Sequence, residues 1–428
     1  MNSGGTSAQG PPWTYKEALA WLYGLQRFGI KLGLENIARL LGELSLRVNG
    51  NAISGINAFR PRVIHVAGTN GKGSVCAMID SICRTRGYRT GLFTSPHLVT
   101  FRERIRVNGE MISEEAVAHG LTTIRDVVAS WDPHPTFFEL ITALATQHFS
   151  DMNVEIIVLE TGLGGRLDAT NAIQSSVSVI TPIDLDHEKW LGKTIAEIAA
   201  EKAGIIKPGV PVVSARQRPE AEEVIRAHAA KCGASLHFVT QSYNDSSVAL
   251  AGSNQRENAA LAIAAVRAAK IDVNEDTIAK GLASIDWPAR FQRWDNRTII
   301  DGAHNTAAAR TLAQMWREVF GNQRATLVLA ILSDKDLRGI CDALVPISES
   351  VLLPKIRSER AADPAALVKL FSTMTPSLPC SVTPNIVEAL SRARAKPNPI
   401  LITGSLHFAG EVLAHLRGEP AAFEECAQ

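Results

Sequence analysis

Residues 63–74, VIHVAGTNGKGS, join a run of β-branched and apolar residues to a glycine-rich loop that carries a lysine. The next residues, 74–86, have the pattern of a helix, so this stretch predicts a strand, a tight loop and a helix in direct succession. Glycines let backbone N–H groups approach phosphate oxygens, and a helix N-terminus adds favourable partial charge. We therefore expect a nucleotide-phosphate loop in which Lys72 neutralises phosphate oxygens and the Ser74 hydroxyl faces Mg²⁺.

The match of this loop to the common pattern GxxxxGK[ST] is imperfect. Gly73 separates Lys72 from Ser74, and Val66 stands where the first glycine would be. A tight strand-to-helix turn that binds nothing is therefore an alternative interpretation. The loop by itself indicates a phosphate site and does not name a reaction.

Around the loop, short β-branched runs alternate with helical stretches, which is typical of an α/β fold with a mainly parallel sheet. The strands expected first are 62–67, 91–94, 155–160, 177–181, 210–214 and 235–239, with helices at 74–86, 114–130, 136–149, 195–206 and 254–269. The pattern pauses near residues 286–288 and restarts with strands at 298–301, 325–331, 350–353 and 400–403 and helices at 306–319 and 365–372. We expect an N-terminal P-loop-type ATPase domain over 1–287, a linker over 288–297 and a smaller C-terminal α/β, Rossmann-like domain over 298–428.

The composition narrows the class of protein. The 428 residues are 46% hydrophobic and 20% charged, as in a globular protein. Lys and Arg number 44 against 43 Asp and Glu, so no sequence-wide basic field exists to attract nucleic acid or a membrane surface. Residues 1–12 predict a frayed tail rather than a signal peptide. Six cysteines without a CxxC pair favour a reducing cytoplasm, and without an interface signature we expect a monomer.

Polar residues follow several expected strands, where ligands of α/β sheets bind. Glu160 ends one strand and precedes a glycine-dense loop, so it is either a Mg²⁺ ligand or a helix cap. His187 follows the next strand, but magnesium prefers oxygen and a lone histidine is more often structural. Lys202 lies in a helical stretch and, on its own, indicates a solvated helix face. Asp301 and His304 either meet a nucleotide across a cleft or cap a helix.

Nine motifs carry a resemblance that covers residues from about 15 to about 410. They are HVAGTNGKGSV (65–75), TSPHL (94–98), ERIRVNGE (103–110), ETGLGGRLDATN (160–171), DLDHEKWLG (184–192), AAEKAGIIKPG (199–209), RFQ (290–292), DGAHN (301–305) and ITGS (402–405). In this order and spacing they resemble folylpolyglutamate synthase and its bifunctional form, dihydrofolate synthase/folylpolyglutamate synthase, in the Mur ligase superfamily. Two positions depart from the family's usual pattern: Thr306 stands where proline is frequent and His407 where tyrosine is frequent.

The resemblance implies an ATP-dependent amide ligase of folate biosynthesis. ATP would phosphorylate a carboxylate of dihydropteroate or of a reduced folate, and the amino group of L-glutamate would attack the acyl phosphate, releasing ADP and phosphate. Folylpolyglutamate synthase activity alone, or another Mur-type amino-acid ligase, is the alternative within the class. A P-loop kinase or a nucleotide-switch module is the alternative from other classes.

The resemblance also assigns residues. The positions that match ATP-binding residues are Thr69, Asn70, Gly71, Lys72, Gly73, Ser74, Asn258, Arg290, Asp301 and His304. The expected magnesium ligands are Ser74, Ser95, Glu160 and His187, and the expected catalytic residues are Lys72, His187 and Lys202. Lys202 matches a lysine that the family carbamylates, which reverses the surface interpretation. Phe138 and Asp168 match positions around the pterin, and Ser405 lies where the second domain helps to bind glutamate.

Overall fold

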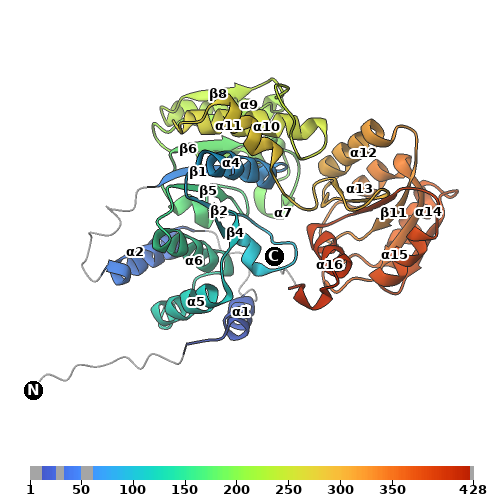
Figure 1. The fold of residues 1–428 in the computed structure, drawn as a ribbon, viewed down its shortest axis with the longest axis horizontal. Coiled ribbons are helices and arrows are strands. Elements are labelled where there is room, and N and C mark those ends of the chain that lie inside the picture. Colours follow the sequence, from blue (N-terminus) through green and yellow to red (C-terminus); the bar gives the residue numbers. More distant parts are fainter. Residues whose placement is uncertain (1–11, 26–32, 50–60, 425–428) are drawn as a thin grey trace, which may run out of the picture.

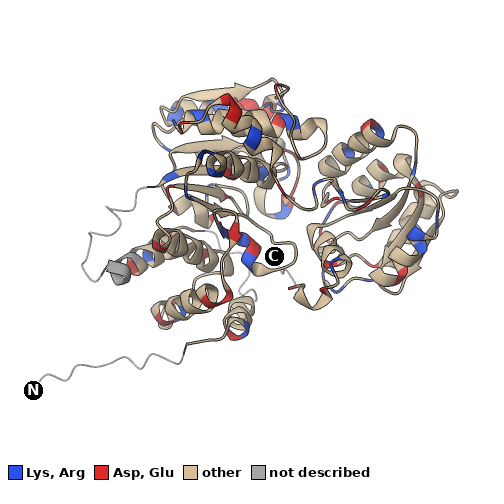
Figure 2. Ribbon diagram, in the orientation of Figure 1, with Lys and Arg blue, Asp and Glu red and all other residues tan. Residues whose placement is uncertain are grey.

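The computed structural model describes residues 12–25, 33–49 and 61–424, and in this part of the chain two α/β domains lie side by side (Figure 1). The tail expected over 1–12 lies, apart from residue 12, outside the described residues. Figure 2 shows Lys and Arg interspersed with Asp and Glu over both domains. Among the described residues, each helix is too short or too polar to cross a bilayer.

The first domain is built on a mainly parallel sheet. Within the described residues its eight strands follow the order β4-β3-β2-β5-β1-β6-β7-β8. Their bounds are β1 Arg62–Ala67, β2 Thr90–Phe93, β3 Ile105–Val107, β4 Glu110–Met111, β5 Ile156–Glu160, β6 Val177–Ile180, β7 Val212–Ala215 and β8 Leu236–Val239. All neighbours are parallel except the pairs β2–β3 and β3–β4. β1 is central and buried, so the loop that follows it opens at the carboxyl edge of the sheet.

Helices cover both faces of this sheet. Their bounds are α1 Tyr15–Gly24, α2 Glu35–Asn49, α4 Lys72–Arg86, α5 Glu114–Val128, α6 Phe137–Asp151, α7 Glu188–Leu191, α8 Ile195–Ala203, α9 Pro219–Lys231, α10 Ser253–Ala268 and α11 Glu275–Ala283, with 3₁₀ turns at η2 Phe101–Arg104 and η3 Ala169–Ala172. One apolar core lies between the sheet and α4, α10 and α11, and a second joins α1, α2, α5 and α6 to the other face. α8 and α9 pack over the end of the sheet formed by β6, β7 and β8.

The second domain repeats the plan on a smaller scale. Its six strands in the described chain follow the order β13-β12-β11-β14-β10-β9. Their bounds are β9 Gln292–Arg293, β10 Thr298–Ile300, β11 Ala325–Leu329, β12 Ser348–Pro354, β13 Cys380–Thr383 and β14 Ile400–Thr403. The helices are α12 Thr306–Phe320, α13 Leu337–Leu344, α14 Pro364–Met374, α15 Ile386–Arg394 and α16 Leu406–Leu416, with 3₁₀ turns at η4 Val345–Ile347 and η5 Pro420–Ala422. Only the β9–β10 pair in this sheet, as described, is antiparallel.

Most expected elements coincide with the observed ones, and the mixed α/β architecture is confirmed. The additional elements are helices α1, α2, α7, α9, α11, α13, α15 and α16, the β3–β4 hairpin and strands β9 and β13. α1 starts at a capping box in which Thr14 and Glu17 exchange hydrogen bonds, which is a local helix-start signal. The domain limits remain a prediction, and the short strand β9 lies inside the expected linker 288–297.

Candidate active site

A cavity of about 480 Å³ lies between the two domains. The glycine loop 68–71 and the start of α4 form its wall in the first domain, and Arg290, Asp301, His304 and Ser405 line it from the second. Nearly all the sequence-predicted site residues meet here, although they come from segments up to 336 residues apart, from Thr69 to Ser405. The cavity is therefore the candidate active site.

The backbone of the loop requires glycine at its tip. Gly71, the residue before α4, has φ +91°, a left-handed conformation that disfavours side chains. A Cβ atom on Gly71 would lie 2.7 Å from the side-chain oxygen of Asn258 on α10. A Cβ atom on Gly73 would lie 3.2 Å from the indole nitrogen of Trp287. The loop is thus held close to its neighbours, with the N-terminus of a 15-residue helix directed at the cavity.

Two lysines converge on the loop. The Nζ of Lys72 donates to the carbonyl oxygens of Gly68 at 3.2 Å and Thr69 at 3.3 Å. The Nζ of Lys202 donates to the same Gly68 oxygen at 2.8 Å. Lys202 is buried, so the interpretation of this residue as part of a solvated helix face is wrong. Burial and the nearby charge of Lys72 lower the pKa of Lys202 to about 7.

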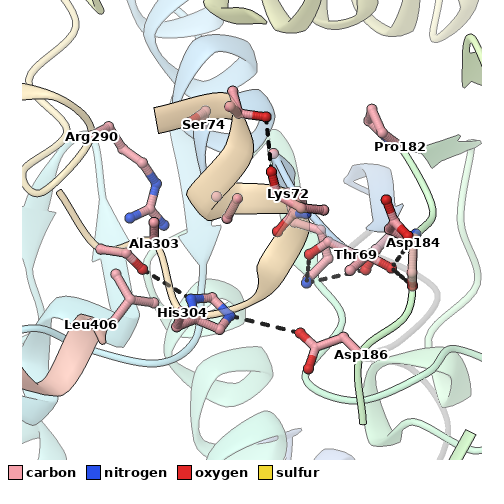
Figure 3. Close-up of a pocket in the computed structure, with 18 of the residues that line it drawn as sticks. Thr69, Lys72, Ser74, Pro182, Asp184, Asp186, Arg290, Ala303, His304 and Leu406 are labelled. Carbon is pink, nitrogen blue, oxygen red and sulfur yellow. Dashed lines mark hydrogen bonds and ion pairs between the residues drawn. The ribbon is translucent and has the colours of Figure 1, made fainter. Parts of the chain in front are cut away.

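The loop is also tied to the segment that follows β6. The backbone N–H groups of Thr69 and Asn70 donate to the carbonyl oxygen of Pro182. The hydroxyl of Thr69 donates to the Asp184 carbonyl oxygen at 3.0 Å and accepts from the Asp184 N–H at 3.1 Å. Figure 3 shows Thr69 and Asp184 in contact beside Lys72. These contacts hold the loop against the segment that follows β6.

Glu160 ends the buried strand β5 and faces the loop. Its carboxylate accepts from the backbone N–H of Ser95 at 3.1 Å, and burial raises its pKa. The Ser74 hydroxyl is buried and has no hydrogen-bond partner among the described residues. A buried carboxylate and an unpartnered hydroxyl, both lining the cavity, fit a hard divalent cation.

The cavity offers few side chains that could bind a metal ion. Within residues 12–25, 33–49 and 61–424, no three side chains of His, Cys, Asp or Glu come together as a metal site. The expected set of Ser74, Ser95, Glu160 and His187 contains two such residues, which suits Mg²⁺ because this ion usually keeps water and substrate phosphate as ligands.

His187 lies seven residues beyond the end of β6, not at the strand end, and it is the N-cap of α7 with φ +52°. Its ring lines the same cavity as Glu160. Desolvation lowers the pKa of His187 to about 4; the neighbouring Asp186 carboxylate opposes this shift, and the charges of Lys335 and Lys72 act in its direction. The ring is therefore neutral near pH 7, which is the form that coordinates a metal.

Asp301 binds two backbone N–H groups near the start of the second domain. One carboxylate oxygen accepts from the Phe291 N–H at 2.7 Å and the other from the Ala303 N–H at 2.8 Å. Burial raises the pKa of Asp301, and the nearby charge of Arg290 opposes this shift. The helix cap is Asn305, whose side chain accepts from the Ala308 N–H, so the capping interpretation of Asp301 is wrong.

Asp186 joins the two domains at the floor of the cavity. Its carboxylate accepts from the Nζ of Lys335 at 2.7 Å and from the Asn305 side chain at 3.1 Å, and both of these residues belong to the second domain. His304 Nε2 lies 3.8 Å from the same carboxylate, a contact drawn in Figure 3. The Asp186 and Lys335 side chains are 9% and 8% exposed. The Asn305 amide also exchanges hydrogen bonds with Asn70 of the loop.

Phe138 and Asp168 lie behind the 162–164 loop that lines the cavity. A Cβ atom on Gly162 would lie 2.5 Å from the Phe138 ring. Asp168 is buried, and its carboxylate accepts from the Gly162 and Leu163 N–H groups, both at 2.9 Å, and from Thr170. These two side chains support the loop from its far side, and their role toward a pterin remains a prediction.

Two further expected residues line the cavity from helix ends. Asn258 projects from α10 beside Gly71 and donates to Gln255 at 3.0 Å. Ser405 is the N-cap of α16, where its hydroxyl accepts from the Phe408 N–H at 3.1 Å. Asp186 and Lys335 are site residues that were not predicted from the sequence. Asp186 stands inside a quoted motif, whereas Lys335 follows a strand end without any motif around it.

The geometry defines a class of protein: a two-domain, nucleotide-dependent enzyme in which a phosphate loop faces a second α/β domain across one cavity. A family profile described as dihydrofolate synthetase, C-terminal domain, matches residues 289–415. A dihydrofolate synthase/folylpolyglutamate synthase of Bacillus subtilis is 34% identical over 438 residues, which cover 94% of this chain and 99% of the relative. The chain belongs to the dihydrofolate synthase/folylpolyglutamate synthase family.

Solved structures of similar proteins share the fold. E. coli FolC in complex with DHPP and ADP has a TM-score of 0.83 at 30% identity, with 95% of this chain and 98% of that chain covered. A bifunctional folylpolyglutamate synthase/dihydrofolate synthase from Yersinia pestis, complexed with AMPPNP and Mn ion, has a TM-score of 0.83 at 29% identity, with 96% and 100% covered.

Proposed function

We propose that this chain is an ATP-dependent ligase that joins L-glutamate to dihydropteroate and to reduced folates and their polyglutamates. The observation that carries the proposal is the phosphate loop with Lys72 facing Arg290 and His304 of the second domain across one cavity. The names of the relatives and the ADP and AMPPNP complexes of similar proteins support it. A free carboxylate is a poor acyl donor, and phosphoryl transfer from ATP gives it a leaving group that the glutamate amine displaces.

The site residues are proposed to bind different parts of the nucleotide. Residues Thr69 to Ser74 bind the ATP phosphates through their backbone, and Lys72 leaves its carbonyl partners to neutralise phosphate oxygens. Arg290 and His304 approach the nucleotide from the second domain, and Asn258 lines its pocket. Domain contact therefore completes the site and excludes water from a reactive acyl phosphate.

A divalent cation belongs to the same proposal, with Mg²⁺ the expected ion. Ser74, Ser95, Glu160 and His187 would hold it, and when bound it would neutralise charge on the transferring phosphoryl group. The buried Ser74 hydroxyl, which has no hydrogen-bond partner in the described part of the chain, and the manganese ion of the Yersinia pestis complex support this assignment.

We further propose that Lys202 is carbamylated. Carbon dioxide adds to a neutral amine to form a carbamate, and one proton is released to solvent. Burial lowers the pKa of Lys202 to about 7, so a substantial neutral fraction exists at physiological pH. The carbamate would carry a negative charge near the Lys72 ammonium group. A carbamate resonance in ¹³C NMR after exposure to ¹³C-bicarbonate, absent in Lys202→Met, tests this step.

Phe138 and Asp168 are proposed to bind the pterin, and Ser405 is proposed to bind glutamate. The enzyme is proposed to act as a monomer in a reducing cytoplasm, which the free thiols of the described cysteines support. Light scattering at micromolar protein concentration tests the oligomeric state.

The deciding experiment measures ADP release with Mg-ATP and L-glutamate, in parallel on dihydropteroate and on tetrahydrofolate. Turnover with both acceptors, lost in Lys72→Ala, is expected. Turnover with tetrahydrofolate alone would indicate folylpolyglutamate synthase activity only, which the engagement of Asp168 within its own loop would explain. Silence with both acceptors in folded protein would refute the proposed function.

A further inference from the structure

The end of the described chain crosses from the second domain to the first. After α16 and the short turn η5, Phe423 and Glu424 run back against the segment that links β2 to β3. Figure 1 shows this red end of the ribbon between α16 and the first domain. The nucleotide chemistry proposed above uses neither residue.

The carboxylate of Glu424 collects hydrogen bonds from separate parts of the first domain. The Tyr15 hydroxyl, on α1, lies 3.0 and 3.1 Å from its two oxygens. The Thr100 hydroxyl donates to it at 3.1 Å and the Phe101 N–H at 2.5 Å. A carboxylate that accepts several hydrogen bonds from uncharged donors fixes the position of each donor relative to the others.

The Glu424 backbone adds a second set of contacts. Its N–H donates to the Val99 carbonyl oxygen at 2.8 Å, and its own carbonyl lies 3.1 Å from Nε2 of His97. Arg104 donates to Nδ1 of His97 at 2.8 Å, so Nδ1 is the acceptor and Nε2 carries the proton that is donated to Glu424. His97 is therefore held in one tautomer and one orientation.

The segment that Glu424 contacts, residues 97–101, adjoins the wall of the active-site cavity. Ser95, Pro96 and His97 line the cavity, and the Ser95 N–H donates to Glu160. α16 also packs on this segment, because a Cβ atom on Gly410 would overlap the Leu98 carbonyl oxygen. A shift of residues 97–101 would consequently displace Ser95 from Glu160.

Phe423 contacts the opposite wall. Its ring is buried and meets the ring of His407 edge to face, with centroids 5.0 Å apart. His407 belongs to α16 and lines the cavity from the second domain. The two neighbouring residues Phe423 and Glu424 thus contact one cavity-lining histidine in each domain.

We propose that Phe423 and Glu424 form a clasp that holds the two domains in register and positions the Ser95–His97 wall for catalysis. Both are positioning residues, since each acts through a histidine or a backbone segment and not on the reacting groups. The kinetic part of this inference rests on the proposed function, whereas the structural part does not.

Hydrogen exchange measured by mass spectrometry on the ligand-free, full-length protein tests the clasp. In Glu424→Ala, peptides covering 97–104 should exchange at least about 10-fold faster, because the Phe101 N–H loses its acceptor. Glu424→Gln should stay close to wild type, since the amide oxygen can still accept from Phe101. Glu419→Ala is the matched control, because Glu419 is exposed and its side chain makes no cap hydrogen bond.

Steady-state kinetics separates positioning from simple stabilisation. Glu424→Ala should lower kcat about 10-fold and raise the Mg²⁺ concentration for half-maximal rate severalfold, because sub-ångström misplacement of a wall is amplified in the rate. A clasp that merely stabilises the fold would lower the melting temperature and leave the Mg²⁺ dependence unchanged. Unchanged exchange over 97–104, or an unchanged Mg²⁺ dependence, would overturn the inference.

One further variant and the exchange experiment cover two other outcomes. If Glu424→Ala does not fold, Tyr15→Phe removes one donor from the same carboxylate and should give a smaller shift in the same direction. If the wild-type protein has no ligase activity, the proposed function fails and the exchange experiment still decides whether the clasp exists.

Discussion

The ion pair between Asp186 and Lys335 allows a quantitative test of domain docking. The atoms are 2.7 Å apart and the side chains are 9% and 8% exposed, so the pair is largely removed from solvent. Asp186→Asn keeps the shape but places an NH₂ group against either Lys335 Nζ or the Asn305 side-chain amide, which are both donors. Removing one partner of a buried pair costs about 3–5 kcal/mol, and we expect about 3 kcal/mol because one acceptor oxygen remains.

A double-mutant cycle isolates the pair. Asp186→Asn, Lys335→Met and the double variant are compared by urea denaturation of the ligand-free protein, followed by tryptophan fluorescence. The coupling energy should be about 2 kcal/mol, and if the domains unfold in sequence it should appear in the first transition. It should persist in 1 M salt, because buried charges are screened little. A coupling below about 0.5 kcal/mol would refute the view that this pair docks the domains.

Three other predictions concern the glycine loop. Lys72→Ala should lower ligase activity at least about 100-fold with both acceptors and weaken binding of an ATP analogue in calorimetry, and unchanged affinity would contradict the assignment of Lys72. Gly71→Ala should destabilise the protein by about 1–2 kcal/mol, because its φ is +91° and the added Cβ would lie 2.7 Å from Asn258. Gly24→Ala, in helix α1 with no described atom within 4 Å of the added Cβ, should leave stability unchanged or raise it by up to about 1 kcal/mol. The pKa of Lys202 falls from 10.5 in the unfolded chain to about 7, so the unfolded state binds more protons between these values and stability should rise with pH across this window. In bicarbonate-free buffer, Lys202→Met should lose that rise in thermal melts, and identical pH profiles would contradict the burial of a neutral amine.

Local patterns were enough to predict the six parallel strands of the first sheet. Strand β1 occupies the expected residues 62–67. A short β-branched run that ends in a glycine-rich loop is typical of a buried central strand of a parallel sheet. The hairpin β3–β4 was missed because its strands are three and two residues long, too short to show a period. α1 was not predicted, although Thr14 and Glu17 form a helix-start signal, because the helix is only ten residues long.

The site was predicted best where it is continuous in sequence. The loop and Glu160 follow strands of one sheet, so their proximity could be inferred from the carboxyl edge that they share. Asp186 and Lys335 are 149 residues apart and meet only because the domains dock, which no local pattern encodes. The burial of Lys202 was also not predicted from the residues around it. A charged residue on a helix indicates an exposed face, and the contact of Lys202 with the glycine loop is visible only in the folded structure.

The Gly68 carbonyl oxygen, shared by the ammonium groups of Lys72 and Lys202, links nucleotide binding to protons. Burial lowers the pKa of Lys202, and the positive charge of Lys72 lowers it further. A polyanion that draws Lys72 off this oxygen and screens its charge removes that second influence, so the pKa of an unmodified Lys202 rises. Binding is then accompanied by proton uptake near neutral pH, and by reciprocity a lower pH tightens the nucleotide. In the unmodified protein, the affinity of the site for phosphate therefore depends on the protonation of Lys202.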